Sequence, residues 1–349
     1  MMTMRERVYA SIRRKGFDAI PWQFDLTEAV ARRVERLYGA EDWREATDDH
    51  IVWVNYRTPA RPQEGLPADV YRSEFGAIWK RSPRDTTVGD WGELLKHPLA
   101  KPSLEGYRFP DPGAVDRWTD VAGVRARYPD RFVMAAAPGL FEVGWSICGF
   151  ENYLSYIAGE PVFIRELNDR LAEVSCGITR TLAGRGADGV RFGDDWGFQD
   201  RLMMRPEVWR RLYKPYYRRI YEAAREAALV VAVHSCGNIT DILGDLADIG
   251  VEVVHPLQPE VMNVEHCARE FGRDLSFWGG LGSQSTLPLG GPEDVRREVR
   301  DRLELFANGG YILAPAGAAP AETPAGNIAA IVDEARAQLS RAEPGHLPP

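Results

Sequence analysis

Cysteine is scarce in this chain of 349 residues, and its four cysteines include no Cys-x-x-Cys pair. Such sparse, scattered thiols exclude a disulfide framework and favour a reducing compartment. No apolar run approaches the roughly 18 residues that a membrane-spanning helix needs. The N-terminal segment alternates charged and apolar residues, so it lacks the uninterrupted apolar stretch of a secretory signal. We therefore expect a cytoplasmic protein with no membrane partner.

Basic charge is also in short supply. The chain has 43 Lys and Arg against 51 Asp and Glu, a net charge of −8, and no concentrated basic block. This balance argues against a nucleic-acid partner. The hydrophobic content of 44% and charged content of 27% are typical of a soluble globular protein. A small-molecule substrate is the expected partner.

Strand-like apolar runs alternate with helix-like runs along most of the chain. The strand-like runs cover residues 19–24, 132–136, 189–192, 229–233, 251–254, 275–278 and 311–313. Helical spacing is clearest at residues 163–183 and in a segment that starts at Pro206, where Pro215 should introduce a kink. Repeated strand–helix units imply a parallel sheet, and about eight strands in a chain of this length predict an α/β fold of the (β/α)₈ TIM-barrel type.

The domain organisation is predicted from composition. We expect a single barrel domain over residues 1–343, followed by a disordered tail at residues 344–349. Residues 50–110 contain strand-like runs at 51–56 and 75–80 among prolines, glycines and charges. We interpret this stretch as an inserted hairpin with loops rather than a second domain.

The most informative motif is His234-Ser235-Cys236, which directly follows the apolar run at residues 229–233. The carboxyl ends of parallel strands are where barrels place their ligands. An imidazole and a thiolate two residues apart can both reach one Zn²⁺, which favours nitrogen and sulfur donors. The alternative is a buried cysteine beside a hydrogen-bonded histidine.

Other strand-like runs also end in polar side chains, which predicts one polar mouth at one end of the barrel. Two adjacent carboxylates suit acid–base chemistry if burial raises one pKa, although they could instead cap a helix or pair with an arginine. The candidate acid–base residues are Asp194, Asp195 and Glu142. The candidate substrate-binding residues are Gln258, Gln284, Trp278 and Arg191, and His255 is a further candidate that is equally compatible with a structural role.

The chain resembles the uroporphyrinogen decarboxylase superfamily, and it is more similar to the methyltransferase-like branch than to the haem-pathway decarboxylase. The resemblance is strongest from about residue 138 to 335. The segments that carry it are Gly139–Glu142, Gly149–Asn152, Gly193–Gly197, Tyr213–Pro215, His234–Asn238, Pro256–Glu260, Trp278–Gln284, Tyr311–Pro315 and Thr323–Pro324.

The resemblance implies a (β/α)₈ barrel with its pocket at the carboxyl ends of the strands. In the corrinoid-linked methyltransferases of this superfamily, the His-x-Cys pair and a later cysteine or histidine bind zinc. The zinc activates a thiol, which takes a methyl group from a methylcorrinoid carried by a partner protein. In the decarboxylases, an aspartate stabilises pyrrole protonation and arginines hold the substrate carboxylates.

The sequence departs from both patterns. Gly317 occupies the position expected for the third zinc ligand, so His255, Asp194 or Glu142 would have to substitute, with His255 as the expected third ligand. The Arg-Gln-Ala-Gly-Arg signature of the decarboxylases is replaced by residues 21–25, Pro-Trp-Gln-Phe-Asp.

Three hypotheses follow. The first is methyl transfer between a methylcorrinoid and a thiol or other acceptor, at a zinc held by His234 and Cys236. The second is metal-free decarboxylation of a tetrapyrrole or smaller carboxylate, with Asp194 or Asp195 as acid and Arg191 as anchor. The third is a non-catalytic barrel that binds a corrinoid protein or a tetrapyrrole. The many aromatic residues also make a homodimer a candidate assembly.

Overall fold

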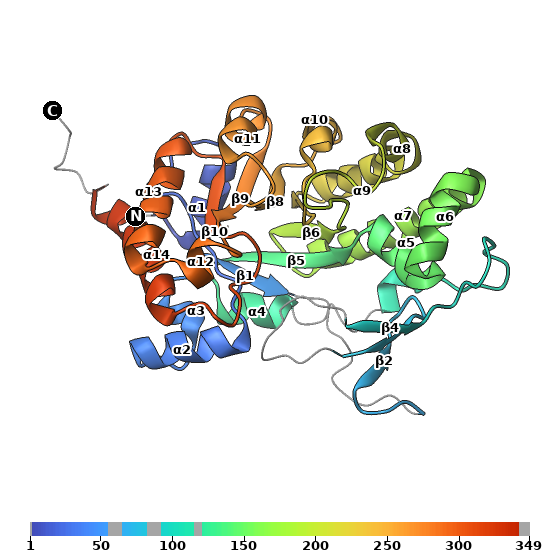
Figure 1. The fold of residues 1–349 in the computed structure, drawn as a ribbon, viewed down its shortest axis with the longest axis horizontal. Coiled ribbons are helices and arrows are strands. Elements are labelled where there is room, and N and C mark those ends of the chain that lie inside the picture. The colour runs from blue at the N-terminus through green and yellow to red at the C-terminus, as the bar shows by residue number, and fades with distance from the viewer. Residues whose placement is uncertain (1, 55–64, 82–91, 115–120, 342–349) are drawn as a thin grey trace.

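A computed structural model describes residues 2–54, 65–81, 92–114 and 121–341, and a curved parallel sheet of seven strands forms its centre (Figure 1). The strand order is β1-β5-β6-β7-β8-β9-β10, so each strand after β5 lies beside its predecessor in the chain. The strands are β1 (Ile51–Val54), β5 (Phe132–Pro138), β6 (Gly189–Gly193), β7 (Val230–His234), β8 (Val253–Leu257), β9 (Ser276–Leu281) and β10 (Tyr311–Pro315).

An extended segment at residues 20–26 takes the eighth position of the barrel. Trp22 forms a parallel bridge with Leu313 of β10, and the backbone N–H of His50 donates to the Trp22 carbonyl at 3.1 Å on the other side. The segment therefore lies between β10 and the start of β1. It makes isolated bridges rather than a regular strand, and Pro21 lacks the N–H that a continuous ladder would use. The expected (β/α)₈ class is confirmed, with this irregular eighth member.

Helices pack around the outside of the sheet (Figure 1). They are α1 (Met4–Ile12), α2 (Glu28–Tyr38), α3 (Trp43–Ala46), α4 (Val121–Arg127), α5 (Leu140–Cys148), α6 (Phe150–Gly159), α7 (Pro161–Gly184), α8 (Pro206–Leu212), α9 (Lys214–Glu226), α10 (Leu243–Asp248), α11 (Val264–Phe271), α12 (Thr286–Leu289), α13 (Pro292–Leu305) and α14 (Ala325–Arg341), with 3₁₀ turns at Pro112–Ala114 and Thr240–Ile242. The kink expected at Pro215 is a complete break, because α8 ends at Leu212 and Pro215 sits in the first turn of α9. None of the helices in the described ranges is long and apolar enough to cross a membrane.

The stretch interpreted as an insertion divides between two sheets. Ile51–Val54 pairs in parallel with β5, so this strand belongs to the barrel and its assignment to the insertion is corrected. A separate antiparallel sheet contains β2 (Val70–Arg72), β3 (Ile78–Lys80) and β4 (Glu93–Lys96), and it lies to one side of the barrel (Figure 1). Residues 55–64 and 82–91 and the predicted tail lie outside the described residues. The division into a barrel domain with an insertion therefore stays a prediction.

Strand alternation decides which side chains enter the barrel. Alternate residues of the strands form one buried cluster inside it, which includes Val230 and Ala232 of β7, Val253 of β8 and Trp278 of β9. The intervening residues join the larger core between sheet and helices. Because side chains alternate along a strand, His234 and His255 continue the inward set at the carboxyl ends of β7 and β8.

Candidate metal centre and active site

His234, Cys236 and Asp195 converge at the carboxyl ends of β7 and β6. The His234 Nε2 lies 3.6 Å from the Cys236 Sγ and 3.5 Å from the Asp195 Oδ1. Asp195 Oδ1 also accepts a hydrogen bond of 2.8 Å from the backbone N–H of Cys236. One donor atom from each residue lies within 4.8 Å of the other two. The predicted pair of His234 and Cys236 thus has a carboxylate, that of Asp195, as its third neighbour.

This donor set fits a zinc ion. Bond lengths of 2.0–2.3 Å in a tetrahedral site separate neighbouring ligand atoms by about 3.3–3.8 Å, and the distances from His234 Nε2 fall in that interval. Imidazole nitrogen, thiolate sulfur and carboxylate oxygen are all zinc ligands, and three protein ligands leave a fourth position open to a reactant. The side chain of Asp195 is 39% exposed, so the site is reachable from solvent.

Gly317 stands at the position where the resemblance places a third ligand. Its φ is +99°, in the region that side chains of L-residues rarely adopt, so a ligand residue at this position would strain the backbone. The loop after β10 therefore presents no donor at Gly317. Asp195, which follows β6, is the residue that could supply a third ligand atom instead.

The structure does not bring His255, the expected third ligand, into this cluster. Its Nδ1 lies 2.7 Å from the Nδ1 of His234, on the side of that ring opposite Nε2. The register of β7 and β8 pairs the two histidines, which places their rings side by side in the barrel. Burial and the nearby Arg191 charge lower the pKa of His234 to about 4, so its imidazole is neutral at neutral pH, as a metal ligand requires.

Asp194 is buried next to the cluster and holds the start of α5. It is 1% exposed, and it accepts hydrogen bonds from the backbone N–H groups of Leu140 at 2.7 Å and Glu142 at 2.6 Å and from the Tyr217 hydroxyl. Burial raises the pKa of Asp194 to about 7, although these hydrogen bonds oppose the rise. The contacts match the capping alternative, because Asp194 satisfies the free amides at the start of α5.

Glu142 is half-buried in the first turn of α5, the helix that Asp194 anchors. Burial is the main cause that raises the pKa of Glu142 well above its usual value, and the charges of Asp195 and Asp194 add to it. The raised pKa makes Glu142 easier to protonate than an ordinary glutamate. This placement suits the acid–base role predicted for it.

Arg191 lies inside the barrel between aromatic and imidazole rings. Its guanidinium carbon is 4.1 Å from the centre of the Trp53 ring, and Trp53 stacks on Trp278 at 4.9 Å with an interplanar angle of 6°. The Arg191 Nη1 lies 3.2 Å from the Nδ1 of His255. Trp278 is fully buried, so it forms the floor beneath the cluster, and its role as a direct substrate contact stays a prediction.

The two glutamines lie at different distances from the cluster. Gln258 is 5% exposed, and its Oε1 accepts from the backbone N–H of Gly237 at 3.2 Å, so it steadies the loop that carries Cys236. Gln284 is exposed, and its backbone N–H donates to Glu260 at 2.8 Å. Substrate binding by either side chain stays a prediction.

Sequence reasoning missed two residues near Arg191. Asp25 follows the early strand-like run, and its charge interacts with Arg191 while burial raises the pKa of Asp25. Trp53 provides the ring under the Arg191 guanidinium. Asp25 could have been predicted from its position at the end of a strand-like run. Trp53 was not considered because its strand was assigned to the insertion.

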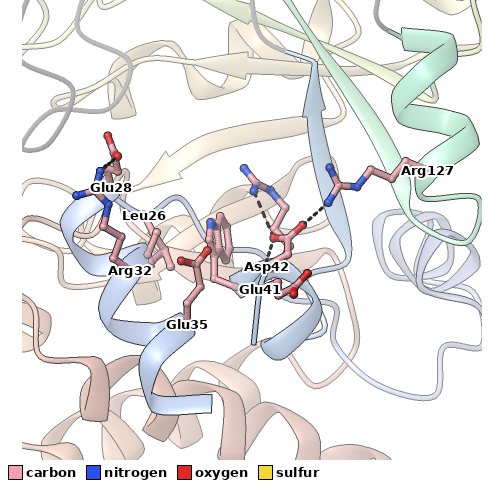
Figure 2. A pocket seen from close by; sticks show the side chains of 10 residues that line it. Leu26, Glu28, Arg32, Glu35, Glu41, Asp42 and Arg127 are labelled. Carbon is pink, nitrogen blue, oxygen red and sulfur yellow. Dashed lines mark hydrogen bonds and ion pairs between the residues drawn. The ribbon is translucent and has the colours of Figure 1, made fainter. Parts of the chain in front are cut away.

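A second hollow lies outside the barrel between α2 and α3 (Figure 2). Some of its charges form ion pairs, since Asp42 contacts Arg127 at 3.1 Å and Arg32 contacts Glu28. The lining residues are Leu26, Glu28, Ala31, Arg32, Glu35, Glu41, Asp42, Trp43, Arg44 and Arg127. It presents surface charges of both signs, and the metal-donor cluster found among the described residues lies elsewhere, at Asp195, His234 and Cys236.

The fold and the cluster define a (β/α)₈ barrel with a candidate metal centre at the carboxyl ends of its strands. Residues 122–338 match the family model described as "Uroporphyrinogen decarboxylase (URO-D)". Because this match covers more than half of the chain, the protein belongs to the uroporphyrinogen decarboxylase family, and the resemblance inferred from the motifs is confirmed.

The similar proteins carry methyltransferase names. The chain is 22% identical over 204 residues to "Methylcobamide:CoM methyltransferase MtaA" of Methanosarcina barkeri, and the match covers 58% of each protein. A protein of the same name from M. barkeri strain Fusaro matches equally. The match therefore spans less than two thirds of these relatives. Among solved structures, a methyltransferase from Methanosarcina mazei superposes with a TM-score of 0.74 at 18% identity, covering 97% of this chain and 99% of that one, which supports the fold.

Proposed function

We propose that this protein transfers a methyl group between a corrinoid carried by a partner protein and a thiol or other small acceptor. The observation that carries the proposal is the convergence of His234 Nε2, Cys236 Sγ and the Asp195 carboxylate at the mouth of the barrel. The names of the relatives from M. barkeri, which refer to methylcobamide and CoM, support the same reaction class.

His234, Cys236 and Asp195 are the residues that would hold zinc. When bound, zinc would supply a Lewis acid that lowers the pKa of a thiol near the open position. Asp194 keeps α5 in place, and α5 presents Glu142, whose pKa is raised by burial and by the charges of Asp195 and Asp194. Gln258 fixes Gly237 and with it the loop of Cys236.

The proposed reaction conserves electrons without an external oxidant or reductant. The acceptor thiol loses its proton to solvent, and its sulfur forms a bond to the methyl carbon as the carbon–cobalt bond of the methylcorrinoid breaks. Both electrons of that bond stay on cobalt. The acceptor is thereby methylated, and the corrinoid is released in its reduced form.

The metal-free decarboxylase hypothesis receives less support from the contacts. It requires Asp194 or Asp195 to approach a substrate as an acid. Asp194 is buried and its oxygens are occupied by α5 and Tyr217, so only Asp195 of the pair is accessible to act as the acid. Arg191, its proposed anchor, lies against Trp53 and His255. The third hypothesis, a barrel that binds a partner but has no catalytic activity, predicts no turnover in the assay described next.

The test measures metal content and methyl transfer with the same preparations. Protein purified after growth with zinc should contain about one equivalent, and it should demethylate methylcob(III)alamin in the presence of a thiol, which is followed by the absorbance of the corrinoid. Cys236→Ala, His234→Ala and Asp195→Asn should each lose metal and activity together.

Matched controls come from the same chain. Asp200→Asn changes an exposed aspartate that pairs with Arg201, and His266→Ala changes a histidine on α11, so both should keep the metal and the activity. A metal content below about a tenth of an equivalent in the wild-type protein would sink the proposal. Activity that survives in Cys236→Ala would do the same.

A further inference from the structure

We infer that His255 is a positioning residue that fixes the tautomer and ring orientation of His234 through the hydrogen bond between their Nδ1 atoms. The inference rests on the proposed function, since it concerns the histidine whose Nε2 faces Asp195 and Cys236. It assigns no metal bond and no substrate contact to His255.

The distance between the two rings requires one shared proton. The Nδ1 atoms of His234 and His255 lie 2.7 Å apart, which is a hydrogen-bond distance between a ring N–H and a ring lone pair. Either ring satisfies this geometry as the donor. The direction of the hydrogen bond is therefore decided by what occupies the other ring nitrogen of His234.

The metal-binding role proposed for His234 sets the direction. A ring nitrogen that binds a metal presents its lone pair, so Nε2 of His234, the atom that faces the thiol and the carboxylate, carries no proton when a metal is bound. The proton of the neutral ring then lies on Nδ1 and is donated to the Nδ1 of His255. The Arg191 Nη1 lies beside both rings, 3.2 Å from the His255 Nδ1 and 3.4 Å from the His234 Nδ1.

The acceptor ring is itself held rigidly. His255 is 3% exposed, and its ring meets the Trp278 ring edge-on at 4.8 Å and 66°. The register of β7 and β8 places the two histidines directly opposite each other. Metal-binding histidines usually donate their second N–H to a carboxylate or a carbonyl. Here a second imidazole, oriented by Arg191 and Trp278, takes that place.

The first experiment compares two substitutions of nearly equal size. His255→Asn keeps an acceptor oxygen close to the position of Nδ1, whereas His255→Leu removes it, and both lose the same ring contact with Trp278. Each variant is titrated with Co²⁺ as a probe, and its dissociation constant is measured by competition with a chelator. His255→Leu should bind Co²⁺ about 10–100-fold more weakly and show altered visible bands. His255→Asn should keep the wild-type spectrum and stay within about threefold of the wild-type constant.

Equal losses in the two variants would mean that His255 acts only through packing, and wild-type behaviour in both would mean that it does not act at all. Either result overturns the inference while the proposed function stands, provided that the wild-type protein binds Co²⁺ and Cys236→Ala does not. If the wild-type protein binds no metal, both proposals fall.

A second measurement needs no variant of His255 to fold. Nitrogen NMR of histidine-labelled wild-type protein distinguishes the two neutral tautomers of each of the six histidines, and His234→Ala assigns the signals of His234. The inference predicts a proton on Nδ1 of His234 and on Nε2 of His255 in protein loaded with zinc. A His255 ring that carries its proton on Nδ1 would overturn it.

Discussion

Tyr217→Phe removes one buried hydroxyl and leaves the rest of the side chain in place. The hydroxyl donates to Asp194, and the ring stacks between Tyr213 at 6.3 Å and Tyr221 at 5.6 Å, contacts that phenylalanine retains. A hydrogen bond to a charged group contributes about 1.5–3 kcal/mol, and a neutral one about 1 kcal/mol. The variant should lose stability within these limits, and the amount should depend on the charge of Asp194.

The sign of the pH dependence follows from the raised pKa of Asp194, about 7. A carboxyl group whose pKa is raised by folding favours the folded state at low pH, and this contribution is lost as pH rises from the unfolded value of about 3.9 to the folded value. The Tyr217 hydroxyl lowers the pKa of Asp194, so removing it raises that pKa further. The extra destabilisation of Tyr217→Phe should therefore grow as pH rises from about 7 to 9.

Tyr221→Phe is the matched control, one turn along the same helix. Tyr221 is also fully buried, but no hydrogen-bond partner of its hydroxyl is found among the described residues. Urea unfolding of both variants at pH 6 and pH 9 gives the required comparison. Tyr217→Phe should cost about 1 kcal/mol at pH 6 and 1.5–3 kcal/mol at pH 9, whereas Tyr221→Phe should change little at either pH. Equal costs for the two variants, or a Tyr217→Phe cost that falls with pH, would refute this account of Asp194.

Three further predictions concern packing around the site. Gly139→Ala should lower the free energy of unfolding by at least about 1–3 kcal/mol, because a Cβ there would overlap the Asp194 carboxylate. The control Gly159→Ala, which has open space around it, should leave the free energy of unfolding unchanged. Equal denaturation midpoints for the two variants would contradict the prediction. Gly237 has a φ of +82°, and a Cβ there would overlap the Gly197 carbonyl. Gly237→Ala should therefore displace Cys236 and weaken metal binding about tenfold, as measured by competition with a chelator. An unchanged affinity would show that the loop adapts to the substitution. Trp53→Ala should lower the free energy of unfolding, measured in urea, by about 3–5 kcal/mol, because the contacts with Trp278 and Arg191 are lost. Trp53→Phe should lower it much less. Similar losses in the two variants would count against the stacking argument.

The regular elements of the second half could be predicted because their apolar runs are unambiguous. The run at residues 229–233 became β7 (Val230–His234), and the helical spacing at 163–183 lies inside α7 (Pro161–Gly184). The first half was harder. Ile51–Val54 is short and is followed by a stretch rich in proline and charge, so nothing local indicated that it pairs with β5. Such long-range pairing is a tertiary property that local patterns do not encode.

The pair His234 and Cys236 could be found from the sequence, but its third partner could not. Neighbouring strands place His255 opposite His234, so chain position alone suggested it as a ligand. The contact is made between Nδ1 atoms, on the far side of the ring from the cluster. Which ring nitrogen faces the other donors depends on side-chain orientation in three dimensions, and a sequence pattern does not determine it.

Asp194 and Asp195 show why two adjacent identical residues do different work. Val190 and Phe192 of β6 face the helices, and Asp194 continues that alternation into the layer between sheet and helices, where it meets α5 and Tyr217. Asp195 takes the opposite side and meets Cys236 and His234. The same parity places Arg191 on the inner face. One carboxylate is therefore buried and occupied by donors, and the other stays accessible at the mouth. A shift of β6 by one residue would bury the carboxylate of the candidate metal centre and expose the one that holds α5, so the candidate site depends on this register as much as on the identity of its residues.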